Sequence, residues 1–301
     1  MSEQKWHRSS LRHLAEKMEH LGYWISHTTI ARLLKKLHYS LKANEKRLAG
    51  SNHPDRDRQF QYLAVQKATF KAAGLPIISV DTKKKELIGN FKNPGQEWCL
   101  KARSVNDHDF EQDALGKAVP YGVYDLQHNH GYVYVGCSAD TPQFAVEVIA
   151  RWWQEIGKGL YPNADKILIL ADSGGSNGCR PHLWKQQLQE LLADQLGLEV
   201  TVCHYPTGAS KWNPIEHRLF GPISMNWAGK PLKTFEFMLA CIRGTDTDTG
   251  LQVEAFLVEK VYAKGIKVAK EIMKTLKIEW HEVCPRWNYT IKPRLAPDLS
   301  F

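Results

Sequence analysis

Residues 166–178 read KILILADSGGSNG, and this stretch decides the fold. A short run of consecutive apolar residues, bounded by turn residues, is typical of a strand that is buried on both faces. The run ends in an acid, Asp172, and small turn-forming residues follow at once. The stretch therefore predicts a buried strand with a carboxylate at its carboxyl end.

Further strands and helices are predicted on both sides of this run. Residues 76–81 (PIISVD) form a second apolar strand that ends in an acid, Asp81. The other expected elements are a helix at about 55–73, hairpin strands at 119–126 and 132–137, helices at 141–156 and 181–196, a strand at 198–204 and a helix that opens at 213. An early antiparallel hairpin beside later βα units predicts an α/β fold, a mixed sheet with helices on its faces. That succession is the one found in ribonuclease-H-like domains.

Three acids stand out by their positions. Asp81 and Asp172 end two strands, and Glu216 opens the helix after the last strand. Ligands of open α/β sheets bind at the carboxyl ends of the strands, so we expect these side chains to converge. Three converging carboxylates repel one another unless a cation compensates, and oxygen ligands suit Mg²⁺ or Mn²⁺. A pair of such ions supports in-line phosphoryl transfer.

Each acid also has a purely structural interpretation. Glu216 follows Asn213 and Pro214 at the spacing of a capping box. Asp81 and Asp172 each precede a residue that suits a turn. The glycine-rich run at 172–178 matches neither GxxxxGK[ST] nor GxGxxG, so we expect close backbone approach beside Asp172 there and no nucleotide site.

The excess positive charge lies in the first quarter of the chain. Residues 1–75 contain 14 Lys and Arg against 6 Asp and Glu, whereas the remaining 226 residues contain 26 of each. Apolar residues at helical spacing predict two short helices here, joined by a turn at residues 22–25 and with Ser26 as the second N-cap. This pattern favours a helix-turn-helix that binds DNA, although a helical hairpin with a basic face fits it too.

Candidate DNA contacts follow from that geometry and from the position of the acids. The second helix would present small polar residues to base edges and basic residues to phosphates: Thr28, Thr29, Arg32, Lys35 and Lys36. Beside the acids we expect DNA contacts from Lys83, Lys84, His204, Lys211 and Trp212, and also from His217 and Arg218. Residues 40–58 are polar and basic and predict a linker along a nucleic-acid backbone, whereas residues 106–113 predict a solvated acidic loop.

Length and composition limit the remaining possibilities. The 301 residues suffice for two domains, which we expect at 1–58, a helix-turn-helix segment with its linker, and at 59–301, a catalytic domain with a C-terminal helical extension. Six scattered cysteines without a CxxC pair argue against a disulfide framework and a structural zinc site. No apolar run approaches the roughly 20 residues of a membrane span, so we expect a cytoplasmic protein with no membrane partner.

Long strings of this sequence resemble a known family. They are SHTTIARLLKKLHYSLKAN at 26–44, ISVDTKKKELIGNF around Asp81, VNDHDF at 105–110, VPYGVYDLQHNHGYVYVG at 119–136, ADSGGSNG at 171–178 and HYPTGASKWNPIEHRLFGPISMNW at 204–227. The chain resembles bacterial insertion-sequence transposases of the DDE superfamily, mariner-like in layout and of the ISAzo group. Members of this group usually begin with a longer DNA-binding region, so we expect recognition of the element ends to be incomplete.

The resemblance implies a ribonuclease-H-like catalytic domain whose triad maps onto Asp81, Asp172 and Glu216. It also implies two Mg²⁺ or Mn²⁺ ions per active site, strand cleavage and 3′-OH strand transfer, and double-stranded DNA as partner, at transposon ends and at the target. A homodimer in a synaptic complex and a nucleoid association in a bacterial cytoplasm follow from it as well. Two alternatives stay open: an inactive remnant that only represses by binding DNA, and a structure-selective nuclease of the same fold.

Overall fold

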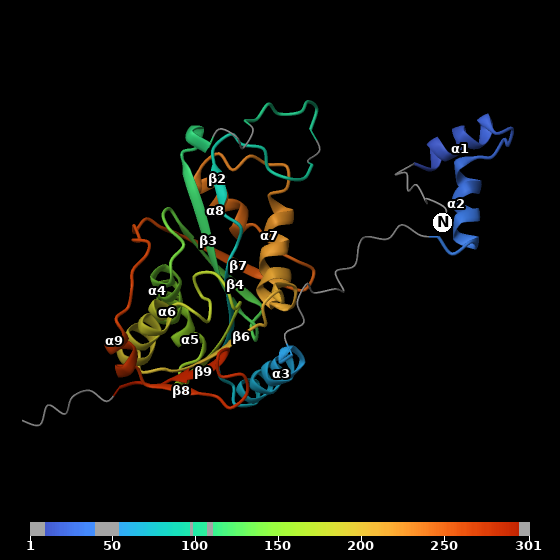
Figure 1. Ribbon diagram of the computed structural model, residues 1–301. Helices are drawn as coiled ribbons and strands as arrows, with labels where there is room; N and C mark the ends of the chain where they lie inside the picture. Colours follow the sequence, from blue (N-terminus) through green and yellow to red (C-terminus); the bar gives the residue numbers. More distant parts are fainter. Residues whose placement is uncertain (1–9, 40–53, 97–98, 107–110, 295–301) are drawn as a thin grey trace, which may run out of the picture. The chain divides into compact units, whose positions relative to one another are not determined.

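The computed structural model describes residues 10–39, 54–96, 99–106 and 111–294 (Figure 1). The chain divides into two compact units, Met1–Ala49 and Gly50–Phe301. Most of the expected linker, residues 40–53, and most of the expected acidic loop, residues 107–110, lie outside the described residues. Within the described part, none of the helices is both long and apolar enough to cross a membrane.

The first unit contains two short helices, α1 (Leu11–His20) and α2 (His27–Lys36). Ser10 and Ser26 cap them, and Gly22, with a φ of 86°, begins the turn between them. The helices match the prediction, but the expected apolar faces are largely open to solvent. Ile30 is buried, whereas Leu33 is 42% exposed. Two ten-residue helices offer too little surface to enclose an apolar core.

The second unit is built on one sheet whose order is β7-β4-β3-β1-β5-β6-β9-β8, with β2 paired to β3. Strands β1, β5 and β6 run parallel, and β3 is antiparallel to both β1 and β4. This arrangement is a ribonuclease-H-like mixed sheet, which confirms the predicted fold class. The strands are β1 (Ile77–Thr82), β2 (Glu86–Ile88), β3 (Gly116–Asp125), β4 (His130–Gly136), β5 (Lys166–Ala171), β6 (Glu199–His204), β7 (Gln252–Val258), β8 (Ile278–Trp280) and β9 (Asn288–Ile291).

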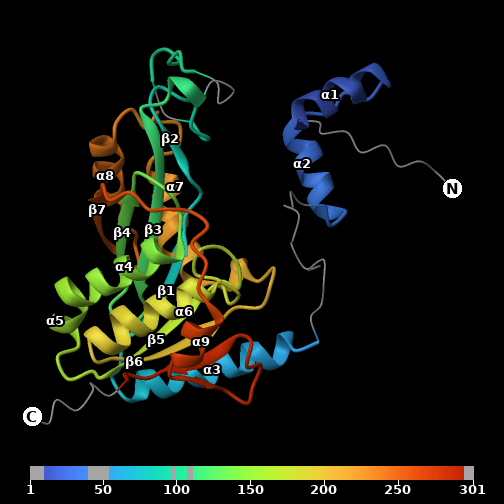
Figure 2. The same cartoon turned by 60° about the vertical axis from the view of Figure 1, so that its left-hand side comes forward.

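Helices cover both faces of the sheet (Figure 1, Figure 2). The core on one face is formed with α4 and α6 and their π-helical continuations η2 and η3, and on the other with α3, η5, α7 and α8. The α-helices are α3 (Arg56–Ala72), α4 (Pro142–Trp152), α5 (Lys158–Leu160), α6 (His182–Gln187), α7 (Gly221–Asn226), α8 (Phe235–Arg243) and α9 (Lys270–Thr275). The π-helices are η2 (Trp153–Gly157), η3 (Leu188–Gln195) and η5 (Glu216–Phe220), and η1 (Glu111–Asp113) and η4 (Ser210–Trp212) are 3-10 turns.

A buried amide pair joins the beginning of this unit to its end. Gln59 of α3 donates to the Asn288 side chain of β9 at 2.7 Å, and Asn288 donates back at 2.6 Å. Both side chains are fully buried. Helix α3 therefore belongs to the second unit from Arg56 onward and matches the helix expected at about 55–73, whereas the expected boundary after residue 58 falls inside it.

The C-terminal part of the chain differs from the expected helical extension. Beside α8 and α9 it contains three strands that join the sheet: β7 pairs with β4, and β8 and β9 extend the sheet beyond β6. Strand β8 is only three residues long, and β7 has exposed polar residues at Gln252 and Glu254. Strand β8 is too short to show a period, and β7 joins the sheet through β4, far earlier in the chain, so the sequence pattern did not indicate them.

Candidate active site

Asp81 and Asp172 lie side by side at the carboxyl ends of two neighbouring parallel strands. Val80 pairs with Ala171 in the register of β1 and β5, so the two acids occupy the next position on each strand. Burial, and then repulsion by Asp172, raise the pKa of Asp81 to about 8. Burial also raises the pKa of Asp172. The fold thus brings two carboxylates together where their charges are unfavourable.

Glu216 comes from η5, which packs against the same face of the sheet. Gly122 lies opposite Asp81 in the β1–β3 register, and a Cβ built on it would lie 2.7 Å from Phe220 and 2.8 Å from Ile215. The absence of a side chain at Gly122 therefore lets the helix of Glu216 approach the strand beside Asp81. Burial and the charge of Asp172 raise the pKa of Glu216, which indicates that its carboxylate belongs to the same electrostatic group.

Asn213 links Asp172 to Ser79 of β1. Its side-chain Nδ2 donates to Asp172 Oδ1 at 3.0 Å, and its Oδ1 accepts a hydrogen bond from the Ser79 hydroxyl. Both Asn213 and Ser79 are fully buried. The capping-box spacing predicted only a role for Asn213 at the helix terminus, but its side chain orients Asp172. The one sign of this role in the sequence is that Asn213 lies three residues before Glu216, an expected catalytic acid.

The structure corrects the role expected for His204. It was expected to contact DNA, but it is fully buried at the end of β6. Its Nδ1–H donates to the Asp172 carbonyl at 2.9 Å, and Nε2 faces the Tyr289 hydroxyl at 3.4 Å. Burial lowers the pKa of His204 to about 4, so the ring is neutral at physiological pH. His204 therefore positions the backbone of Asp172.

The structure also corrects the role expected for Lys83. It is buried, its Nζ lies 3.4 Å from Glu86 Oε1, and the same ammonium lies 4.6 Å from the centre of the Trp227 ring. Its charge lowers the pKa of Glu216, although burial dominates that group. A lysine held in this way cannot serve as a surface contact for phosphates. Its neighbour Lys84 is exposed, as that role requires.

Other expected DNA contacts lie on the surface of the two units. Trp212 is 43% exposed, and the guanidinium of Arg56 lies 4.7 Å from its ring and the Lys211 ammonium 4.9 Å from it. His217 hydrogen-bonds the Lys211 carbonyl, and Arg218 is exposed. In the first unit, exposed basic side chains follow one face of α2, namely Arg32, Lys35 and Lys36. The N-cap serine hydrogen-bonds the hydroxyls of Thr28 and Thr29.

The glycine-rich loop after Asp172 folds back against the end of β1. Asn177 donates to the Val80 carbonyl at 3.3 Å, and Ser176 lies 3.4 Å from the Thr82 hydroxyl. A Cβ on Gly178 would lie 3.0 Å from the backbone of Ser173 and of Gly174. This is the close backbone approach that the sequence predicted.

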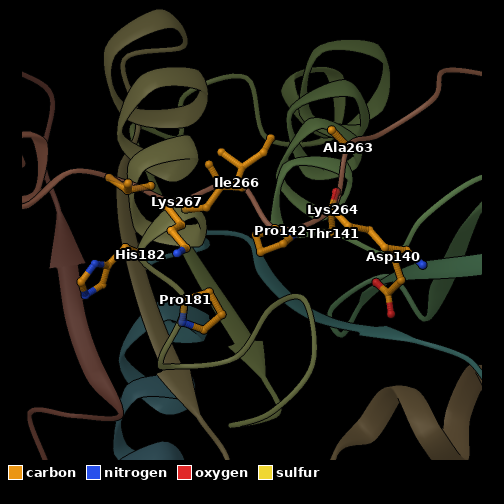
Figure 3. Close-up of a pocket in the computed structure, with 12 residues that line it drawn as sticks. Asp140, Thr141, Pro142, Pro181, His182, Ala263, Lys264, Ile266 and Lys267 are labelled. Carbon is orange, nitrogen blue, oxygen red and sulfur yellow. The ribbon is translucent and has the colours of Figure 1, made fainter.

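Asp140 is a fourth acid that the sequence analysis did not single out. It accepts a hydrogen bond from the Thr82 hydroxyl at 3.1 Å and lies 3.5 Å from Lys85 Nζ, and its charge helps to raise the pKa of Asp81. A pocket of about 440 Å³ opens beside it, between the beginnings of α4 and α6 and residues 263–268 (Figure 3). Asp140 directly precedes the N-cap of α4, so its position gave no catalytic signal.

The donor set fits a divalent metal ion. Asp81 and Asp172 supply hard oxygen ligands, which Mg²⁺ and Mn²⁺ prefer, and a cation would relieve the repulsion that raises the pKa of Asp81. Within the described residues, however, no three His, Cys, Asp or Glu side chains are already grouped closely enough to hold an ion. The fit therefore rests on the aspartate pair, with Glu216 on the adjoining helix.

The strand order of the sheet, with carboxylates at the ends of β1 and β5, is that of a ribonuclease-H-like domain. The sequence matches the family described as the Rhodopirellula transposase DDE domain over residues 1–293, and the chain belongs to that family. The family is one of transposase DDE domains, as the sequence resemblance implied.

Solved structures of one distant protein share features of this fold. The Mos1 transposase paired-end complex with left transposon end is 16% identical, with a TM-score of 0.46, and the similarity covers 76% of this chain and 63% of that one. The Mos1 mariner paired-end complex with Mn is 14% identical, with a TM-score of 0.46, covering 78% and 70%. The chain thus spans less than two thirds of the first of these. Comparison with curated proteins gives no match.

Proposed function

We propose that the protein cleaves DNA at the ends of its transposable element and joins the freed 3′-OH to target DNA, with Asp81, Asp172 and Glu216 as the catalytic triad. The observation that supports this most is the register that sets Asp81 and Asp172 next to each other at the ends of β1 and β5. Neighbouring buried carboxylates are costly without a cation, and such clusters concentrate at functional sites.

In this proposal the three carboxylates hold two divalent ions, Mg²⁺ or Mn²⁺. When bound, these ions supply Lewis acidity for the attacking and the leaving oxygen of an in-line displacement. The residues of the chain orient the ligands: Asn213 fixes one carboxylate oxygen of Asp172, and His204 fixes its carbonyl. In the first step a water oxygen bonds to phosphorus and the bond from phosphorus to the 3′ oxygen breaks. The freed 3′ oxygen then bonds to a target phosphorus, the bond from that phosphorus to the target strand's own 3′ oxygen breaks, and the departing oxygen takes up the proton that the attacking hydroxyl loses.

We assign DNA contacts to both units of the chain. Helix α2 would bind the element ends, with its threonines towards base edges and its basic residues on phosphates. Near the triad, Lys84, Lys211 and Trp212 would contact the strand beside the scissile bond. Two copies of the chain would hold two ends in one synaptic complex. The exposure of these side chains supports the assignment.

The test is end cleavage by Asp81→Asn, Asp172→Asn and Glu216→Gln, with the exposed Glu236→Gln as a matched control. Each triad variant should lose nearly all metal-dependent cleavage and still bind end DNA in a gel-shift assay, whereas the control should cleave normally. Wild-type protein that binds ends without cutting would support the repressor alternative. Cleavage of branched DNA with no preference for ends would support the nuclease alternative.

A further inference from the structure

Two neighbouring chambers share part of their lining, and the first of them begins at the residue after Asp172. The inner chamber, about 270 Å³, is lined by Ser173 and Thr207 and by Cys284. The outer chamber, about 490 Å³, is lined by Lys185, Met273 and Trp280. Four residues line both chambers and so join them: Cys179, Arg180, Pro285 and Arg286. We call this feature the Arg180–Arg286 groove.

The charge of the groove is positive. Arg180 and Arg286 are exposed, and within the described part of the chain neither forms an ion pair. Lys185 is buried at 4% exposure and donates to the Cys179 carbonyl at 2.5 Å, while its ammonium lies 5.4 Å from the centre of the Tyr289 ring. Among the described residues that line the outer chamber, none is Asp or Glu. Asp55 lines the inner one.

The walls of the groove also suit a nucleic acid strand. Trp280 is 49% exposed, and Met273 and Pro285 continue the apolar surface beside it. Grooves that bind nucleic acid strands combine cations along the backbone with aromatic faces for sugars and bases. An arginine guanidinium matches phosphate oxygens with two parallel hydrogen bonds, which free arginines can form.

We propose that the Arg180–Arg286 groove binds the sugar-phosphate backbone of the DNA strand that continues from the scissile phosphate. Arg180 and Arg286 bind its phosphates, and Trp280 contacts a sugar or base. The position of the scissile phosphate rests on the proposed function, but the binding of DNA in the groove does not require catalysis. The Ser173 hydroxyl, 3.3 Å from that of Thr207, marks the inner end of the path.

The cysteines of the chain allow a direct test. Cys179 and Cys284 line the groove, whereas Cys241, which is also partly exposed, lies on α8. The protein is alkylated with iodoacetamide, without divalent ions, in the presence of a duplex that carries an element end and its flanking DNA. At free duplex about ten times its Kd, alkylation of Cys179 and Cys284 should slow about tenfold, because only free protein reacts. Cys241 should react at its original rate.

A charge variant tests the same groove by affinity. Arg180→Gln combined with Arg286→Gln should reduce the slope of log K against log salt by roughly 1.8, because two phosphate contacts are lost. The control, Lys158→Gln combined with Lys233→Gln, removes the same charge from exposed positions outside the groove and should leave the slope unchanged. An unchanged slope in the arginine variant would overturn the proposal, as would equal protection of all three cysteines or of none.

These outcomes are separate from those of the proposed function. Asp172→Asn should keep the protection of Cys179 and Cys284 even though cleavage is lost. Protection without any cleavage by the wild-type protein would retain the groove and reject the catalytic proposal. Cleavage that depends on the triad, with no protection, would reject the groove alone.

Discussion

Gly122→Ala should separate Glu216 from Asp81 by a small, defined amount. The added methyl carbon would lie 2.7 Å from Phe220 Cε1 and 2.8 Å from Ile215 Cδ1. Carbon atoms normally pack at about 3.5–4.0 Å, and the side chains of Ile215 and Phe220 are both buried, so we expect the helix that carries them to shift by roughly 1 Å to make room for the methyl group. Ile215 directly precedes Glu216, and the carboxylate therefore moves with it. A displacement of about 1 Å costs on the order of 100-fold in rate, and overpacking costs about 1–3 kcal/mol of stability.

The assay measures the initial rate of end cleavage at saturating Mg²⁺, together with gel-shift binding of end DNA and thermal unfolding. DNA binding should be unchanged, so the loss should lie in the cleavage step. Gly159→Ala is the matched control, because a Cβ at that exposed position meets nothing within 4 Å. A folded Gly122→Ala protein that cleaves at the wild-type rate would refute the reasoning that close packing at Gly122 places Glu216.

Four further predictions concern charge. Because the pKa of Asp81 is about 8, a metal ion must displace a proton from this carboxyl below that pH. The Mg²⁺ concentration that gives half-maximal cleavage should therefore fall up to roughly tenfold per pH unit and become constant above pH 8. Cleavage titrations with Mg²⁺ at several pH values measure this. Because the folded metal-free protein holds this proton more tightly than the unfolded chain, its unfolding free energy should decrease from about pH 4 to pH 8, and Asp81→Asn should flatten that decrease in urea titrations. Lys83→Met leaves the buried Glu86 without its partner and should cost about 3–5 kcal/mol of stability, whereas Lys84→Met should change the urea midpoint little. Neutralising the basic face of α2 should flatten the salt dependence of end binding by roughly 0.9 per charge, and an unchanged slope would move the DNA site elsewhere; the substituted residues are Arg32, Lys35 and Lys36.

The central strands could be predicted because their own residues determine their burial. Strands β1 and β5 have helices on both faces, so nearly every position is apolar and the run is visible in the sequence. The acids that follow them could be found for the same reason, since the end of the run marks the edge of the sheet. Strands β7 and β8 are edge strands, and their pairing depends on partners far away in the chain.

The errors at the site have one physical cause, which is that distant residues decide whether a polar side chain is buried. His204 lies at the end of β6, which pairs with β9, and the Tyr289 hydroxyl that its ring faces is 85 positions away in the sequence. Lys83 is buried only because Trp227 and Glu86 enclose its ammonium. Asn213 meets Ser79, 134 positions earlier, instead of its own helix terminus. Local spacing contains no information about such partners.

The amide pair between Gln59 and Asn288 has a consequence for the synthesis of the protein. These residues are 229 positions apart, so α3 cannot complete its contact with β9 until nearly the whole second unit has left the ribosome. At about 5–20 residues per second, the early helix waits roughly 10–45 s for its partner. A nascent chain that stops before residue 288 lacks these two hydrogen bonds. The second unit is therefore completed only after residue 288 has been synthesised, and a copy interrupted earlier lacks the strand that pairs with β6.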